Sequence, residues 1–151
     1  GSNSANIVHG SAALTLAKAL TVYETFGEAD VPDDGQRYFV VSPAGWADLL
    51  QIDQFSRAEY VGEQDLPYAG GMTAKRWLGF LWFTHSGLSL SSTTRDCHAY
   101  HSSSVGLATG SDVRTEINYV PEKVSNLITS YFSAGAVMID NDGAIECQIT
   151  E

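Results

Sequence analysis

Residues 31–51 restrict the fold of this 151-residue chain more than any other segment does. They open with Pro-Asp-Asp-Gly at 32–35, a composition typical of a tight turn. Arg-Tyr-Phe-Val-Val follows at 37–41, and its β-branched and aromatic side chains favour a short buried strand. Ser42 then stands where a helix N-cap belongs, and Pro43 suits the first helical position. The segment therefore predicts a turn, a strand and a capped helix in direct succession.

The composition of the chain narrows its possible functions. An apolar content of 44% predicts a packed globule rather than a disordered chain. The formal net charge is −10 with only eight Lys and Arg residues, whereas non-specific nucleic-acid binding depends on clustered positive charge. No apolar run is long enough to span a bilayer. We therefore expect no membrane partner and no sequence-specific binding of DNA.

An amphipathic helix is expected near the N-terminus. Residues 11–26 carry apolar side chains at helical spacing, and one face is shared by Ala13, Leu16, Leu20, Tyr23 and Phe26. Gly27 suits the C-terminal end of this helix. The pattern therefore predicts that the face of Leu16, Leu20 and Tyr23 is buried.

A β-hairpin is expected at the C-terminal end. Residues 126–140 and 144–149 are rich in β-forming side chains. Asn141, Asp142 and Gly143 lie between them, and these residue types accept the positive φ angles of a hairpin turn. Because an isolated two-stranded ribbon is only marginally stable, this hairpin should pack against another element.

Cysteine and histidine side chains that could bind zinc cluster at residues 97–101, with His85 nearby. Alternate residues of a strand point to opposite faces, so Cys97 and His98 would not converge on one ion. The two cysteines of the chain, Cys97 and Cys147, are expected to stay reduced and packed. We therefore expect no metal site at this cluster.

Carboxylates gather at two places, residues 30–34 and residues 140–146. Both groups lie in or beside turns, where Asp and Asn serve backbone geometry. A calcium loop beginning at Asp140 would need its final glutamate at Glu151, the last residue. The Gly-x-Ser-x-Gly motif of serine hydrolases is absent from the sequence. We therefore predict no catalytic residue, no cofactor and no bound metal.

Several short sequence motifs resemble those of one family, the Hong Kong 97-like major capsid proteins of tailed bacteriophages. Residues 31–50 resemble the "Val-Pro-acidic-Gly-Arg-Tyr" and "Ser-Pro-x-x-Trp-x-x-Leu-Leu" wording that opens the axial domain of that family. Residues 99–108 and 133–149 resemble later family phrases, although Ser102 and Ser104 replace the usual Lys and Ala. The order of these phrases along the chain carries the resemblance, more than any one motif.

The resemblance implies an α+β fold with a central mixed or antiparallel sheet flanked by helices. A long N-terminal helix would pack beside the C-terminal hairpin. Residues 1–10 would be a frayed N-terminus, and residues 11–151 would form a single capsid-like domain. Within that domain, residues 11–35 would belong to the spine helix, residues 36–124 to an axial-like region and residues 125–151 to the hairpin.

The function implied by the resemblance is structural. The chain would be a major capsid subunit of a tailed phage or prophage, not an enzyme, which joins copies of itself in pentamers and hexamers. The shell would enclose double-stranded DNA in the virion after assembly in the bacterial host cytoplasm. Gly1-Ser2 is typical of a cleavage scar. The chain is therefore expected to be a fragment without the family's N-terminal arm and extended loop, and not to form shells alone.

A second interpretation remains open. The aromatic residues Trp77, Phe80, Trp82 and Phe83 could line the pocket of a small acidic ligand-binding or hydrolase domain. Such residues more often fill a core or an interface. A convergent set of polar groups around one cavity would favour this alternative.

Overall fold

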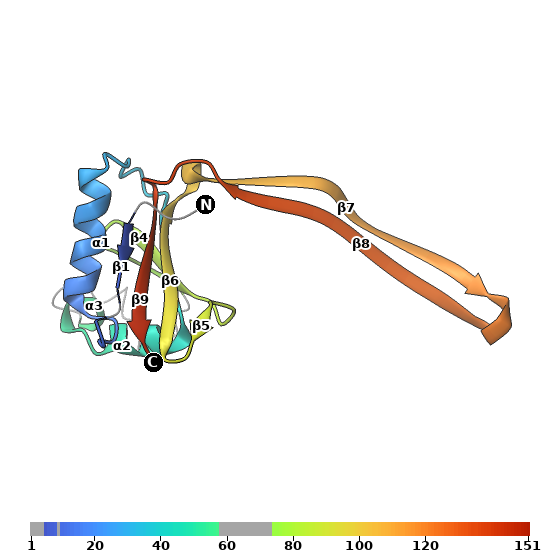
Figure 1. Ribbon diagram of the computed structural model, residues 1–151, viewed down its shortest axis with the longest axis horizontal. Helices are drawn as coiled ribbons and strands as arrows, with labels where there is room; N and C mark the ends of the chain where they lie inside the picture. Colours follow the sequence, from blue (N-terminus) through green and yellow to red (C-terminus); the bar gives the residue numbers. More distant parts are fainter. Residues whose placement is uncertain (1–4, 9, 58–73) are drawn as a thin grey trace.

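The computed structural model describes residues 5–8, 10–57 and 74–151 of the chain. The structure has a body, built on one mixed sheet, and a long arm that projects from it (Figure 1). No helix among the described residues has the length and apolar character needed to cross a membrane. Half of the frayed start predicted for residues 1–10, residues 1–4 and 9, lies outside the described residues, whereas residues 5–7 form a strand.

The sheet of the body has the hydrogen-bonded order β1–β9–β6–β2–β4–β3, and β5 adds to β6. β1 runs parallel to β9 and β2 runs parallel to β4, while the other pairs are antiparallel. This mixed arrangement confirms the predicted α+β class at the level of the sheet. The strands are β1 Ala5–Ile7, β2 Arg37–Val41, β3 Ala74–Trp77, β4 Phe80–Thr84, β5 Leu90–Ser91, β6 Thr94–His101 and β9 Ala144–Thr150.

The turn, strand and capped helix predicted for residues 31–51 are all present. β2 is followed directly by helix α2, Pro43–Leu50, with Pro43 as its first residue. The Ser42 hydroxyl accepts a hydrogen bond from the Gly45 N–H at 3.0 Å, which satisfies one of the free donors of the first helical turn. This cap fixes the point at which the chain leaves the sheet and turns back over it.

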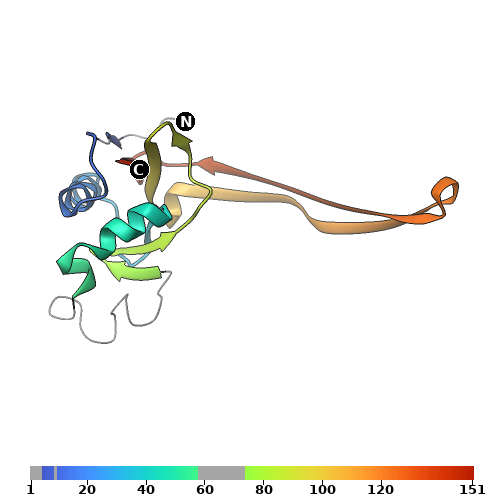
Figure 2. The same cartoon turned by 90° about the horizontal axis from the view of Figure 1, so that it is seen from below.

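The helices α1, Leu16–Glu28, and α2 cover one face of the sheet, with the short helix α3, Asp53–Ser56, at its border (Figure 2). Aromatic side chains dominate the core between these layers. The Phe39 ring stacks on Trp82 with centroids 4.0 Å apart, and Phe26 meets Phe80 edge-on at 5.1 Å. These four side chains are fully buried, so they form the core rather than a ligand pocket.

The arm is an antiparallel hairpin of strands β7, Val105–Val120, and β8, Ser125–Met138, joined by the short 3-10 helix η3, Pro121–Lys123. Among the described residues, these strands pair with each other and with no third strand. Both views show the arm extending well beyond the body (Figures 1 and 2). The register shifts twice near the middle, between Thr109 and Ser111 and between Ser111 and Arg114.

The predicted pairing across residues 141–143 is wrong. β8 pairs with β7, whereas β9 inserts between β1 and β6. β9 buries Ile145, Cys147 and Ile149, so it needs neighbours on both sides and a helix over one face. Asn141, Asp142 and Gly143 therefore form the connection from the arm back to the body, not a hairpin turn. Turn-forming residues specify a change of chain direction, but not which strands pair.

The predicted orientation of the N-terminal helix is wrong for Leu20 and Tyr23, although Phe26 of the same predicted face is buried. α1 buries Ala19, Val22 and Phe26, whereas Leu20 and Tyr23 are 45% and 44% exposed. The helix packs on the sheet of the body and contacts β1 and β9 rather than the arm. The small side chains of Ala19 and Val22 let the helix approach the sheet closely, which the larger stripe would not. α1 therefore carries two apolar stripes, and the sheet covers only one of them.

Candidate assembly surface

The arm is the largest exposed apolar feature of the described residues. Its strands turn large hydrophobic side chains to solvent along almost their whole length, and these residues are Leu107, Val113, Ile117, Tyr119, Leu127, Ile128, Tyr131, Phe132 and Val137. Ile117 and Ile128 face each other across the two strands and are 68% and 65% exposed. A soluble monomer rarely exposes such a surface, so it is the signature of an interface.

Polar cross-strand contacts help to fix the strand pairing in the outer half of the arm despite this exposure. The Thr115 and Ser130 hydroxyls lie 3.0 Å apart, and the Tyr131 hydroxyl donates to Glu116 at 3.1 Å. Each such pair contributes only a few tenths of a kcal/mol to about 1 kcal/mol. An isolated two-stranded ribbon is marginal in water, so further contacts must stabilise the arm.

The root of the arm is tied to the body by a polar network around the 3-10 helix η2, Ser102–Ser104. The Ser104 carbonyl accepts the N–H groups of Ile139 at 2.8 Å and Asp140 at 3.4 Å, so the first and last residues of the arm lie together. The Ser102 hydroxyl donates to the Gln36 side chain at 2.6 Å. These bonds fix the direction in which the arm leaves the body.

His101 belongs to the same network. Its Nε2 lies 3.0 Å from Asp34 Oδ1, and its Nδ1 lies 2.7 Å from the Ser103 hydroxyl. The hydrogen bond from His101 lowers the pKa of Asp34, followed by the backbone N–H of Gln36. The set has the composition of a hydrolase triad, but His101 Nδ1 also accepts the Ser103 backbone N–H, as a helix cap does. We therefore interpret these residues as the support of the arm.

The zinc cluster considered from the sequence does not come together. Cys97 points into the core, His98 lies on the opposite face of β6, and His101 binds Asp34. His85 accepts the Gly87 N–H in an exposed turn. In the described ranges, no three metal-binding side chains lie close enough to hold an ion. Strand alternation, which argued against the site from the sequence, accounts for this separation.

Three carboxylates of the two acidic groups accept hydrogen bonds from nearby groups of the same chain. Asp34 accepts the Gln36 N–H at 2.9 Å, and Asp140 accepts the Asp142 N–H at 3.1 Å, so both act as turn formers. Glu146 accepts from Gln148 at 3.1 Å on the sheet surface. Asp34 and Asp140 thus take part in turns, whereas Glu146 lies within strand β9.

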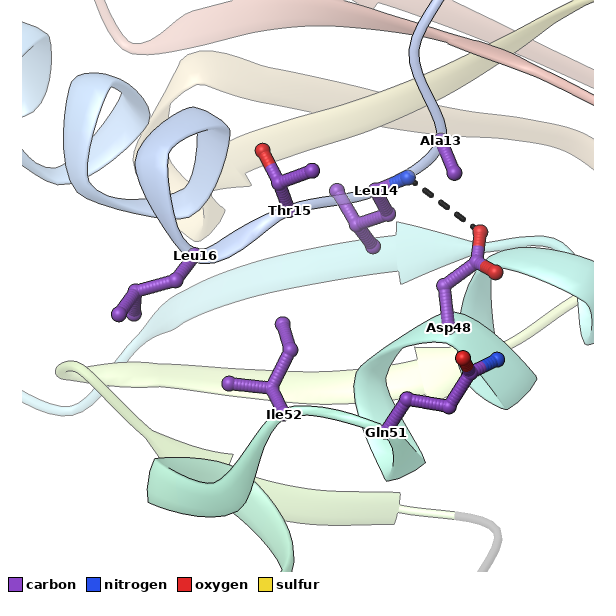
Figure 3. A pocket seen from close by; sticks show the side chains of 7 residues that line it. All are labelled: Ala13, Leu14, Thr15, Leu16, Asp48, Gln51 and Ile52. Carbon is purple, nitrogen blue, oxygen red and sulfur yellow. Dashed lines mark hydrogen bonds between the residues drawn. The ribbon is translucent and has the colours of Figure 1, made fainter.

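Two hollows in the body are shallow and lack convergent polar groups. The first, of about 260 Å³, lies between the start of α1 and the end of α2 (Figure 3). Asp48 is its one ionisable side chain, and Asp48 Oδ2 already accepts the Leu14 N–H at 3.3 Å. The second, of about 280 Å³, is lined mainly by apolar atoms at the root of the arm. Neither has the arrangement expected of a catalytic pocket.

The residues that matter most in this surface were only partly visible in the sequence. Alternation at residues 113–120 predicts a strand, and they lie within β7. The sequence of residues 102–108 predicts one or two helical turns, but only residues 102–104 are helical, as η2, and residues 105–108 begin β7. Leu107 and Val137 were assigned to no exposed surface. In the sequences of β7 and β8, apolar and polar residues alternate only weakly, because apolar side chains occupy both faces of the ribbon. This weak alternation is the sequence signal that could have identified the arm as an exposed surface.

Comparison with known proteins identifies the family of this chain. The model of one protein family, described as phage capsid protein, matches residues 1–151. The chain belongs to the phage capsid protein family. The family resemblance found in the sequence is thereby confirmed. No curated protein matches the chain.

Solved structures share the fold of this capsid family member. A chain from Mycobacterium phage Che8 superposes with a TM-score of 0.73 at 18% identity, covering 96% of this chain and 53% of that one. The capsid of cyanophage P-SCSP1u gives 0.68 at 15% identity, covering 99% and 54%. The holo-SrpI encapsulin complex of Synechococcus elongatus PCC 7942 gives 0.61 at 10% identity, covering 96% and 53%. The chain thus spans about half the length of each of these structures.

Proposed function

We propose that the chain is the shell-forming part of a major capsid subunit whose arm packs against neighbouring copies of the same protein. The observation that carries this proposal is a two-stranded arm with solvent-exposed Leu107, Ile117 and Ile128. A ribbon of this kind gains stability only when other surfaces cover it. Family membership supports the choice of further subunits as that cover.

The chemistry of the body supports a structural role rather than an enzymatic one. The aromatic residues of the alternative interpretation, Phe80 and Trp82, are fully buried in the core. In the body, the pKa values that are raised most are those of the Cys97 and Cys147 thiols, and burial is the main cause of both shifts. Desolvated thiols without an adjacent base are inert rather than catalytic.

The charge of the chain suits the wall of a container. We propose that the assembled shell of the virion encloses double-stranded DNA without binding it tightly. A formal net charge of −10 repels phosphate groups, so the packaged nucleic acid would not be immobilised on the wall. Assembly in the host cytoplasm, into pentamers and hexamers, is part of the same proposal.

The test places two glutamates at the centre of the arm. Ile117→Glu with Ile128→Glu in the full-length subunit should prevent particle formation, because covering two carboxylates costs several kcal/mol. The body should stay folded, since both side chains are exposed. Electron microscopy and sedimentation velocity would measure assembly, and circular dichroism would measure folding.

A matched control places one carboxylate on the exposed turn before β6, as Thr93→Glu, and should leave assembly intact. The conservative pair Ile117→Val with Ile128→Val should also assemble. Normal particles from the double glutamate variant would refute a role for the arm in assembly.

A further inference from the structure

The body has a second apolar surface that the arm does not explain. The face of the sheet turned away from α1 and α2, here called the open face, carries Tyr38 and Tyr100 in one row with Leu81, and Val40 and Phe83 in the next. All five side chains are half-buried, and the two tyrosine rings stack with centroids 5.5 Å apart. In the described part of the chain, the helices lie on the other face.

The opposite side of the body carries a matching surface. Leu16, Leu20 and Tyr23 lie at helical spacing on α1, on the stripe that the sheet does not cover, here called the outer stripe. Leu20 and Tyr23 are 45% and 44% exposed. α1 lies on the side of the sheet away from the arm in both views (Figures 1 and 2). One molecule therefore has an unpartnered helix surface on one side and an unpartnered sheet surface on the other.

We infer that the outer stripe of one subunit packs on the open face of the next, so that successive bodies stack helix against sheet. An amphipathic helix and a sheet face are complementary layers, and a sheet with helices on both faces is a common stable arrangement. The two surfaces are different, so the contact is head-to-tail and can close into a ring. This inference rests on the proposed function, because it gives the subunits a second contact, centred on the body and reaching only the root of the arm.

Charge and shape indicate that a second copy of the chain covers the open face. The outer stripe is bordered by Glu24 and Glu28, whereas the open face carries the exposed guanidinium of Arg76 beside Leu81. The carboxylates of the open face, Asp96 and Glu146, lie on β6 and β9, on the other side of β2 from Arg76, and Glu146 ends the row of Val40 and Phe83. The Arg76 edge of the open face can therefore meet the glutamates of the outer stripe, which favours this pairing over packing of two outer stripes.

A hollow on the open face adds a place for a protruding side chain. It has a volume of about 280 Å³ and lies where the sheet meets the root of the arm. Its walls include His98 and Tyr100 from β6, with Val105 and Met138 from the arm. Apolar walls with two polar groups suit a tyrosine, whose ring is apolar and whose hydroxyl needs a hydrogen-bond partner when covered. Tyr23 of the neighbouring subunit has these properties.

The experiment joins the centres of the two surfaces with a short bis-maleimide. In the full-length subunit, the pair Leu20→Cys and Val40→Cys should give a ladder of covalent multimers beyond the dimer. A ladder arises because each subunit offers a different cysteine to each of two neighbours. Tyr23→Cys with Phe83→Cys is a second pair that should behave in the same way. The native Cys97 and Cys147 are buried, so the parent chain should remain monomeric on a denaturing gel.

Single variants decide between arrangements. Leu20→Cys alone and Val40→Cys alone should give no cross-linked product, whereas dimers from Leu20→Cys alone would show helix packing on helix and overturn the inference. Absence of the ladder from both folded pairs would also overturn it, with or without particles. Electron microscopy of the same samples separates the two claims: particles without a ladder leave the proposed function standing, and a ladder without particles supports only this inference.

Discussion

At the tip of the arm, Val124 has a left-handed backbone, with φ 47° and ψ 46°, and its side chain is 80% exposed. This conformation is strained for a β-branched residue and costs about 1–3 kcal/mol. Val124→Asn should relieve part of the strain, since Asn accepts the left-handed region. We expect slower hydrogen exchange of the arm amides, by about fivefold for each 1 kcal/mol regained.

A control for this change is Val113→Asn, which replaces a valine that is 68% exposed within β7. That substitution should not slow exchange, because Asn is a poorer strand former than Val. Faster exchange in Val124→Asn would show that the valine side chain, rather than its backbone, determines the stability of the tip.

The two cysteines face each other across β6 and β9, and both are fully buried. Burial raises the pKa of Cys97 to about 11 and that of Cys147 to about 12. At pH 8 the folded protein should therefore resist iodoacetamide, and intact mass should show two adducts only after unfolding. Rapid labelling of the native protein would contradict this description of the core.

The same shifts predict a loss of stability in base. An unfolded cysteine ionises near its ordinary pKa of 9.0, whereas the folded thiols stay protonated to about pH 11 or 12. The stability that these protonated thiols contribute is complete below pH 9 and is lost as the pH rises through the folded pKa values. The urea concentration at the midpoint of unfolding should decrease when the pH is raised from 8 to 10.5. This decrease should be smaller in Cys147→Ala than in the parent.

Among the helices, α1 offers a direct comparison of its two apolar stripes. Phe26 is fully buried against Phe80 and the guanidinium of Arg37, so Phe26→Ala should cost about 3–5 kcal/mol. Leu20→Ala on the outer stripe should change the free energy of unfolding by no more than about 0.5 kcal/mol in the unassembled chain. Urea denaturation of both variants would measure the difference. An equal loss in both would place the outer stripe inside the core.

Sequence patterns predicted some elements of the fold better than others. The helix cap at Ser42 and the strand before it were predictable because their signals are local. The burial of α1 was mispredicted because helical periodicity marks two stripes and does not rank them. The partner of β8 was mispredicted because strand pairing depends on distant segments, and the turn at residues 141–143 serves either arrangement. The arm itself was missed as a surface for the same reason.

As a whole, the molecule consists of a body with its own core and an arm that contributes no residue to that core. The two ends of the arm meet at the carbonyl of Ser104. Joining Ser104 to Asp140 through a short glycine linker should therefore leave the body folded, with little change in its melting temperature. The shortened subunit should fail to form particles. Calorimetry and electron microscopy would test these two expectations, and an unfolded product would show that the arm supports the body.

The two register shifts near the middle of the arm have a geometric consequence. Residues 109–114 interrupt the ladder of hydrogen bonds, and the ribbon changes direction along its length (Figure 1). The arm is therefore two segments that point in different directions, an inner one held by the root and an outer one that ends at the tip. A flat surface could cover only one of these segments, so an interface along the whole arm would have to be bent as the ribbon is.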